Sequence, residues 1–174
     1  RYLRCGLSSL DINEVDLLEN YCIALGIRGF HKWKEHWIRR YRGMDDEGIE
    51  EINKIKERFL QEIQDFYEQM KGRKITVEER TRSLYEFICR CRIQEALKKK
   101  EEAFRLQGEM ALVKEYEQIY GIIMNLLDKI VMVLGDEKIS LDEYRQILEA
   151  GFLEAKVGVI PPTADQVLVG DMER

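Results

Sequence analysis

A short stretch of this sequence, residues 28–42, holds the side chains best suited to chemistry with a polyanion. We call it the basic segment. Its cationic residues are Arg28, Lys32, Lys34, Arg39, Arg40 and Arg42, against one acidic residue, Glu35. Trp33, Trp37 and Tyr41 are interleaved with them at intervals of four residues. Cationic groups release counterions from phosphates and aromatic rings stack on unpaired bases, so this combination is typical of single-stranded nucleic-acid binding.

Two other interpretations of the basic segment stay open. In the first, the aromatic rings belong to a protein core, and the cations form a solvated face that balances acidic neighbours. In the second, the segment is a protein-interaction module that packs against a partner protein or neighbouring domains through its apolar groups. Those groups are Phe30, Trp33, Trp37, Ile38 and Tyr41. Burial or exposure of the two tryptophans is the observation that tests the interaction module.

The composition limits what the whole chain can do. Its 174 residues carry 33 acidic and 28 basic side chains, for a formal net charge of −5. This balance excludes a protein that coats nucleic acid by bulk charge, so a polyanion site has to be local. Apolar residues make up 45% of the chain, enough for a packed core, and the length favours one domain. No apolar run reaches the roughly 20 residues of a membrane span.

Catalytic and cofactor motifs are absent from the sequence. It contains no G-x-S-x-G, no P-loop and no G-x-G-x-x-G. His31 and His36 are five residues apart and do not share a helix face closely. Cys89 and Cys91 form a C-x-C pair rather than the two C-x-x-C pairs of a zinc site. We therefore expect no catalytic residue, cofactor or metal in this chain, and free thiols in a reducing, cytoplasmic setting.

Helices are the elements expected to position the basic segment. Pro161 and Pro162 are the only prolines. The absence of proline from residues 1–160 favours helices there, because a proline inside a helix costs ~3 kcal/mol. Capping boxes at 11–14, 76–79 and 140–143 predict three helix starts. Apolar residues recur at spacings of three and four over 49–70 and predict a long amphipathic helix. In a helix over 30–42, Trp33, Trp37 and Tyr41 would share one face.

The remaining patterns complete the predicted fold. A helix is expected from 77 to a break at Gly108, another from about 109 to 134, and a shorter one from 141. Two β-branched runs flank the prolines and predict two strands with a turn. The fold class is therefore mainly α, a helical bundle over residues 1–156, with a short C-terminal β element over 157–174.

Two stretches go beyond generic helix patterns. Residues 15–29 contain Val-Asp-Leu-Leu-Glu-Asn-Tyr followed by Ala-Leu-Gly-Ile-Arg-Gly, and residues 160–174 read Ile-Pro-Pro-Thr-Ala-Asp-Gln-Val-Leu-Val-Gly-Asp-Met-Glu-Arg. Shorter stretches at 134–136 and 147–151 fit the same pattern. Together they resemble the B subunit of the AddAB helicase–nuclease, an ATP-dependent deoxyribonuclease of Firmicutes. The clear matches lie in the first ~40 and last ~40 residues, whereas the middle agrees only in helical character.

The resemblance implies that the chain is an internal piece of a much longer bacterial protein. Residues 1–156 would be a helical insertion equivalent to the 2B subdomain of superfamily 1 helicases, and 157–174 would lead back to a RecA-like domain. The family unwinds and resects DNA ends in double-strand break repair, together with an A subunit. It uses ATP, Mg and an iron–sulfur cluster bound elsewhere in the parent. We therefore assign none of these roles to Cys5, Cys22, Cys89 or Cys91, and expect the piece to be inactive by itself.

Overall fold

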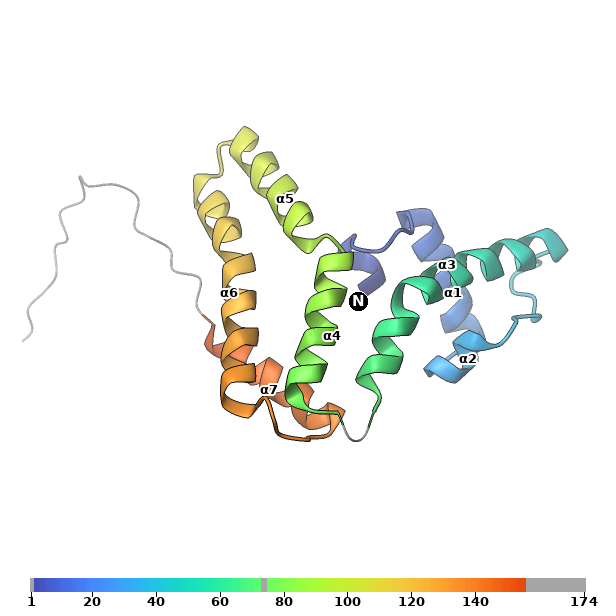
Figure 1. Cartoon of the computed structure of the whole chain (residues 1–174). Helices are drawn as coiled ribbons and strands as arrows, with labels where there is room; N and C mark the ends of the chain where they lie inside the picture. The colour runs from blue at the N-terminus through green and yellow to red at the C-terminus, as the bar shows by residue number, and fades with distance from the viewer. Residues whose placement is uncertain (1, 73–74, 156–174) are drawn as a thin grey trace, which may run out of the picture.

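The computed structural model describes residues 2–72 and 75–155, and the regular secondary structure of these residues consists of helices. These residues form one short 3-10 helix and seven α-helices, and the α-helices are labelled in Figure 1. In chain order they are η1 (Tyr2–Cys5), α1 (Ile12–Leu25), α2 (Phe30–Lys34), α3 (Asp46–Met70), α4 (Val77–Arg90), α5 (Ile93–Gln107), α6 (Met110–Leu134) and α7 (Leu141–Glu154). The predicted helical bundle is confirmed. The β element predicted over 157–174 lies outside the described residues.

The capping boxes form where the sequence predicts them. Asp11, Thr76 and Ser140 each accept a hydrogen bond from the backbone N–H three residues on, and the glutamate at that position bonds back to the cap. Each box satisfies two backbone donors that the first helical turn leaves free, which fixes where α1, α4 and α7 begin. Gly26 ends α1 in the left-handed conformation, at φ 63°.

The first of two apolar cores joins η1, α1, α2 and the N-terminal half of α3, and we call it the N-terminal core. Leu18 and Tyr21 of α1 pack there with Ile52 and Phe59 of α3 and with Trp37 from the loop after α2. All five side chains are buried. This core lies directly beneath the basic segment, so its packing decides how that segment is held.

The second core, the C-terminal core, joins the end of α3 to α4, α6 and α7. Met70, Val77, Ile130 and Tyr144 form its buried centre. The Tyr144 hydroxyl lies 2.9 Å from the Thr81 hydroxyl, so the one polar atom of this ring has a partner inside the core. Because α3 contributes Ile52 and Phe59 to one core and Met70 to the other, this long helix connects the two halves of the molecule (Figure 1).

The prediction of a single helix from 77 to Gly108 is wrong, because the chain turns at Cys91–Arg92 and continues as a second helix. Arg92 adopts a left-handed conformation, at φ 50°, that an α-helix does not contain. The turn lets α5 leave the line of α4 and pack along α6, which returns after Gly108 (Figure 1). The sequence gives no sign of this turn, because no residue of α5 is buried and the helical spacing continues across Cys91–Arg92.

Candidate nucleic-acid interface

The basic segment is not one helix. Helix α2 covers only Phe30–Lys34, and Glu35 already has extended backbone angles. The prediction that Trp33, Trp37 and Tyr41 share a helical face is therefore wrong. The physical reason is that side chains of α3 bond to the backbone of this loop in place of helical partners. Asn53 bonds to both backbone polar groups of Trp37, and the Lys56 ammonium donates to the carbonyl of Glu35.

The two tryptophans of the segment contribute to the N-terminal core. Trp37 is 5% exposed, and its ring stacks on Tyr21 with centroids 4.9 Å apart. Trp33 is half-buried and packs against Trp37 and Phe59. In this arrangement the Trp37 ring has little free surface on which a base could stack. Tyr41 is half-buried against the same core, so the aromatic residues meet there without the regular spacing of a helix face.

Half of the cations in the segment have partners inside the described chain. The Lys34 ammonium lies 2.7 Å from a Glu68 carboxylate oxygen. The Arg40 guanidinium lies 2.6 Å from Asp46 at the start of α3. The Arg42 guanidinium lies over the Tyr41 ring, 5.3 Å from its centroid. These contacts are exposed to solvent, which weakens them, so they do not prevent a phosphate from competing.

The other three cations have neither a carboxylate partner nor an aromatic ring against them in the part of the chain that the structure describes. They are Arg28, Lys32 and Arg39, and all three are exposed. Each therefore offers a full positive charge to solvent. Of the residues selected from the sequence, these three have the geometry that best suits a phosphate contact.

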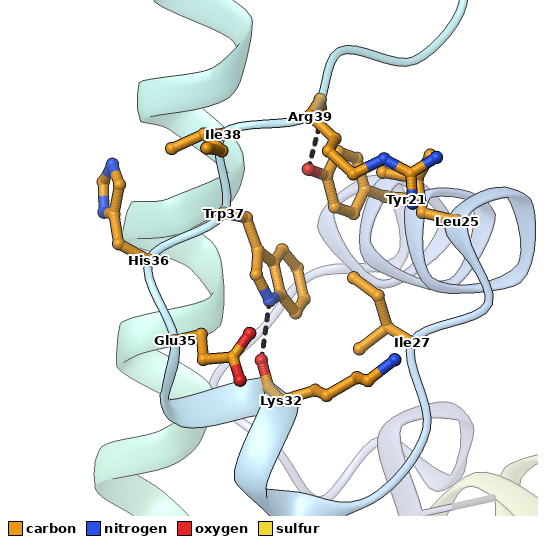
Figure 2. A pocket seen from close by; sticks show the side chains of 9 residues that line it. All are labelled: Tyr21, Leu25, Ile27, Lys32, Glu35, His36, Trp37, Ile38 and Arg39. Atoms are coloured by element: carbon orange, nitrogen blue, oxygen red, sulfur yellow. Dashed lines mark hydrogen bonds between the residues drawn. The ribbon is translucent and has the colours of Figure 1, made fainter.

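Lys32 and Arg39 lie at opposite ends of a small cavity of about 170 Å³ (Figure 2). The Trp37 ring stands between them, and the apolar side chains of Leu25 and Ile27 line the cavity. The backbone at both ends is fixed. The indole Nε1 of Trp37 donates to the carbonyl of Lys32 at 2.9 Å, and the Tyr21 hydroxyl donates to the carbonyl of Arg39 at 2.6 Å.

Comparison with known proteins gives a consistent result over the whole chain. It is 42% identical to the B subunit of the ATP-dependent helicase/deoxyribonuclease of Lachnoclostridium phytofermentans, over 100% of the chain and 15% of that protein. It is 40% identical to the protein of the same name from Clostridium acetobutylicum and 37% identical to that of Acetivibrio thermocellus, in each case over 100% of the chain and 16% of the relative. The chain belongs to the helicase/deoxyribonuclease B subunit family. No protein-family model matches it.

The chain spans only about 15% of the length of the helicase/deoxyribonuclease B subunits that it matches. This confirms the family suggested by residues 15–29 and 160–174, and it confirms that the chain corresponds to a segment of a longer protein. The relatives are bacterial proteins named as ATP-dependent helicase/deoxyribonucleases.

Other side chains that could do chemistry are scattered over this segment of the B subunit. His31 is exposed, with its Nδ1 atom 3.1 Å from Glu35. All four cysteines are free thiols, and burial raises the pKa of the Cys22 thiol to about 11. Among the described residues no group of three or more His, Cys, Asp or Glu side chains could hold a metal ion. No helix in residues 2–72 and 75–155 is long and apolar enough to cross a membrane.

Two residues that were not predicted from the sequence, Asn53 and Lys56, hold the basic segment in place. Both are polar residues of α3, and both are buried. A signal for them exists in the helical period. Positions 49, 53, 56 and 60 continue the spacing of four, three and four along the buried side of α3. A polar residue at such a position is inside the protein, where it needs a hydrogen-bonding partner.

Proposed function

We propose that this segment of the B subunit is a non-catalytic part of the helicase/deoxyribonuclease that contacts DNA phosphates through its basic segment. The observation that carries the proposal is the set of three exposed cations that have neither a carboxylate nor an aromatic partner among the described residues, Arg28, Lys32 and Arg39. Lys34, Arg40 and Arg42 supply further positive charge at the edge. The names of the relatives state an activity on DNA, a polyanion that such a surface attracts.

In this proposal the chemistry of the enzyme takes place in other parts of the parent protein and its partner. ATP, Mg and an iron–sulfur cluster are bound outside this chain, and the A subunit is the expected partner. Residues 1–156 correspond to a 2B-like helical subdomain, and 157–174 lead back to a RecA-like domain. The segment guides DNA during end resection in double-strand break repair, in the bacterial cytoplasm.

The structure changes which residues of the basic segment the proposal uses. Trp37 packs against Tyr21 and Trp33, so we assign it to the core rather than to base stacking. Backbone phosphates therefore carry the contact, and the interaction is expected to depend strongly on salt and weakly on sequence.

The test is a DNA-binding titration of the full-length B subunit in its complex, at several salt concentrations. The variant replaces Arg28, Lys32 and Arg39 with glutamate. Its matched control replaces Lys98, Lys99 and Lys100 with glutamate, which gives the same charge change on exposed α5, where none of the three lysines has a described ion pair. We expect the magnitude of the slope of log K against log salt to fall by about 2–3 in the first variant, because each phosphate contact contributes roughly 0.7–0.9.

Equal slopes in the wild type and in the Arg28, Lys32 and Arg39 variant would contradict the proposal. An equal loss in both variants would mean that general charge, rather than this segment, attracts DNA. Replacing Arg39 and Arg40 together gives a milder version of the same test, since Arg40 is already paired with Asp46.

A second function, docking of this segment onto a partner protein, is favoured by a different part of the surface. The interaction module predicted at the basic segment would need its aromatic groups at the surface, but there only Ile38, 75% exposed, is a large apolar side chain that is fully open. On α6 and α7, however, Met132, Val133 and Leu153 are exposed. Charged substitutions at Met132 and Leu153 that weaken assembly with the A subunit, without changing DNA affinity, would support this function.

A further inference from the structure

The backbone from Glu35 to Trp37 is held by side chains of one neighbouring helix. Buried backbone N–H and C=O groups need partners, and this loop has neither a helix nor a strand to supply them. The N–H of Trp37 donates to Asn53 Oδ1 at 3.0 Å, and Asn53 Nδ2 donates to the carbonyl of Trp37 at 2.8 Å. The side-chain amide of Asn53 thus pairs with Trp37 as a residue of a neighbouring strand would.

Lys56, one turn further along α3, completes this arrangement. Its ammonium donates to the carbonyl of Glu35 at 2.6 Å and to Asn53 Oδ1 at 3.0 Å. It also lies over the Trp37 ring, 5.0 Å from the centroid. The residue is 2% exposed and has no carboxylate partner among the described residues. A charge buried in this way is costly, so its three polar and aromatic contacts are what retain it.

We propose that Asn53 and Lys56 are positioning residues for DNA contact, because they fix the loop that holds Lys32 and Arg39 at the two ends of the cavity. This inference rests on the proposed function of the basic segment. Neither residue can reach DNA itself, since both side chains are buried beneath the loop. They act through Trp37, whose indole bonds to the carbonyl of Lys32 and whose backbone lies two residues before Arg39.

Two buried side chains therefore control the affinity of a surface that they do not form. Removing Asn53 leaves the N–H and C=O of Trp37 without partners, so the loop from Glu35 to Arg39 no longer has one preferred position. Lys32 and Arg39 then keep their charge but lose their fixed spacing, and binding has to offset the entropy of ordering them again. DNA affinity should therefore fall although no charge on the protein surface has changed.

The experiment measures DNA affinity and its salt slope for the full-length B subunit in its complex, with Asn53→Ala, Lys56→Met and Lys56→Arg. Thr81→Val is the matched control, because it removes one buried hydrogen bond, to Tyr144, in the other core. Lys32→Ala with Arg39→Ala reports directly on the proposed function. Hydrogen exchange of the Trp37 amide in the same proteins reports whether the loop has been released.

We expect Asn53→Ala and Lys56→Met to lower the magnitude of the salt slope by about 1–2, as the loss of one or two phosphate contacts would. Lys56→Arg keeps a donor and should retain most of the slope, and Thr81→Val should retain all of it. If the Lys32 and Arg39 variant loses affinity while Asn53→Ala and Lys56→Met bind as wild type, the positioning role is wrong and the proposed function stands. If the Lys32 and Arg39 variant binds as wild type, the proposed function itself fails.

Discussion

The N-terminal and C-terminal cores each contain a buried cation that bonds to backbone carbonyls, and they use it differently. In the N-terminal core, Lys56 holds a single loop, at Glu35, with the help of Asn53. In the C-terminal core, Arg80 is 1% exposed and donates to the carbonyls of Met70, Gly72 and Ile139. Neither cation has a carboxylate partner among the described residues.

The partners of the two buried cations indicate that Arg80 has the purely structural role. Arg80 joins two connections, because it donates to Gly72 after α3 and to Ile139 before α7. Its fork of fixed donors can reach several carbonyls at once, which suits a purely structural link. Lys56 holds the loop that carries the exposed cations of the molecule's basic segment. A change at Arg80 should therefore affect folding, whereas a change at Lys56 should affect mainly the surface above it.

We expect Arg80→Met to destabilise the chain strongly. It leaves three carbonyls without their donor and separates the two connections that Arg80 joins. We expect the free energy of unfolding to fall by about 2–4 kcal/mol, as for other losses of a buried hydrogen-bond network. Urea unfolding of the chain, followed by far-UV circular dichroism, measures this loss.

The same protein provides an internal control for that experiment. Its only tryptophans, Trp33 and Trp37, both pack in the N-terminal core, so their fluorescence reports on that core. The transition seen by tryptophan fluorescence should shift less than the transition seen by circular dichroism. Equal shifts would show that α3 makes the two cores unfold as one unit, and no separate stability could then be assigned to each core.

Substitutions at helix caps also test whether the two cores unfold separately, with a smaller loss of stability. Asp11→Ala removes the cap of α1 in the N-terminal core, and Thr76→Ala removes the cap of α4 in the C-terminal core. Each should cost about 1 kcal/mol, because an orphaned backbone donor is left at the helix start. Asp11→Ala should move the fluorescence transition more than Thr76→Ala does, and the opposite ranking would contradict the assignment of the caps to separate cores.

Most of the fold could be predicted from the sequence because its signals are local. The three capping boxes and the apolar stripe of α3 each depend on residues within one or two turns, and all of them are confirmed. The turn at Arg92 could not be predicted, because nothing in the neighbouring sequence requires a left-handed residue there. It is the packing of α5 along α6 that selects it, and this contact is not local.

The candidate site was predicted less completely, for a related reason. The exposed cations are visible in the composition of residues 28–42, but the path of their backbone is decided by Asn53 and Lys56, which come later in the chain. Helical spacing placed Trp37 on a helix face, whereas its backbone bonds to Asn53 instead. The helical spacing of residues can indicate which of them are buried. It does not show that a polar side chain will bond to the backbone in place of the partners that a helix would provide.

A weak pH dependence of stability should distinguish Lys56 from Arg80. Burial lowers the pKa of the Lys56 ammonium below its ordinary value of 10.5, and the nearby Glu57 charge opposes this only in part. In the window between the lowered pKa and 10.5, the unfolded chain binds more protons than the native protein, so the Lys56 contribution to the free energy of unfolding rises with pH. The arginine guanidinium stays protonated throughout this range.

The measurement is the difference in unfolding free energy between wild type and Lys56→Met, taken at several pH values from about 7 to 10.5. The difference removes the contributions of Tyr2, Tyr21 and Tyr144, whose pKa values burial raises and which titrate in both proteins. The free energy of unfolding of the wild type should rise relative to that of Lys56→Met as the pH rises. The matching difference for Arg80→Met should stay flat below the range in which Tyr144 titrates, since the Arg80 charge also lowers the pKa of that hydroxyl. If the difference between wild type and Lys56→Met did not change with pH, the bonds of Lys56 to Glu35 and Asn53 would fully offset the cost of burying its charge. The two cores would then not differ in how well they accommodate a buried cation.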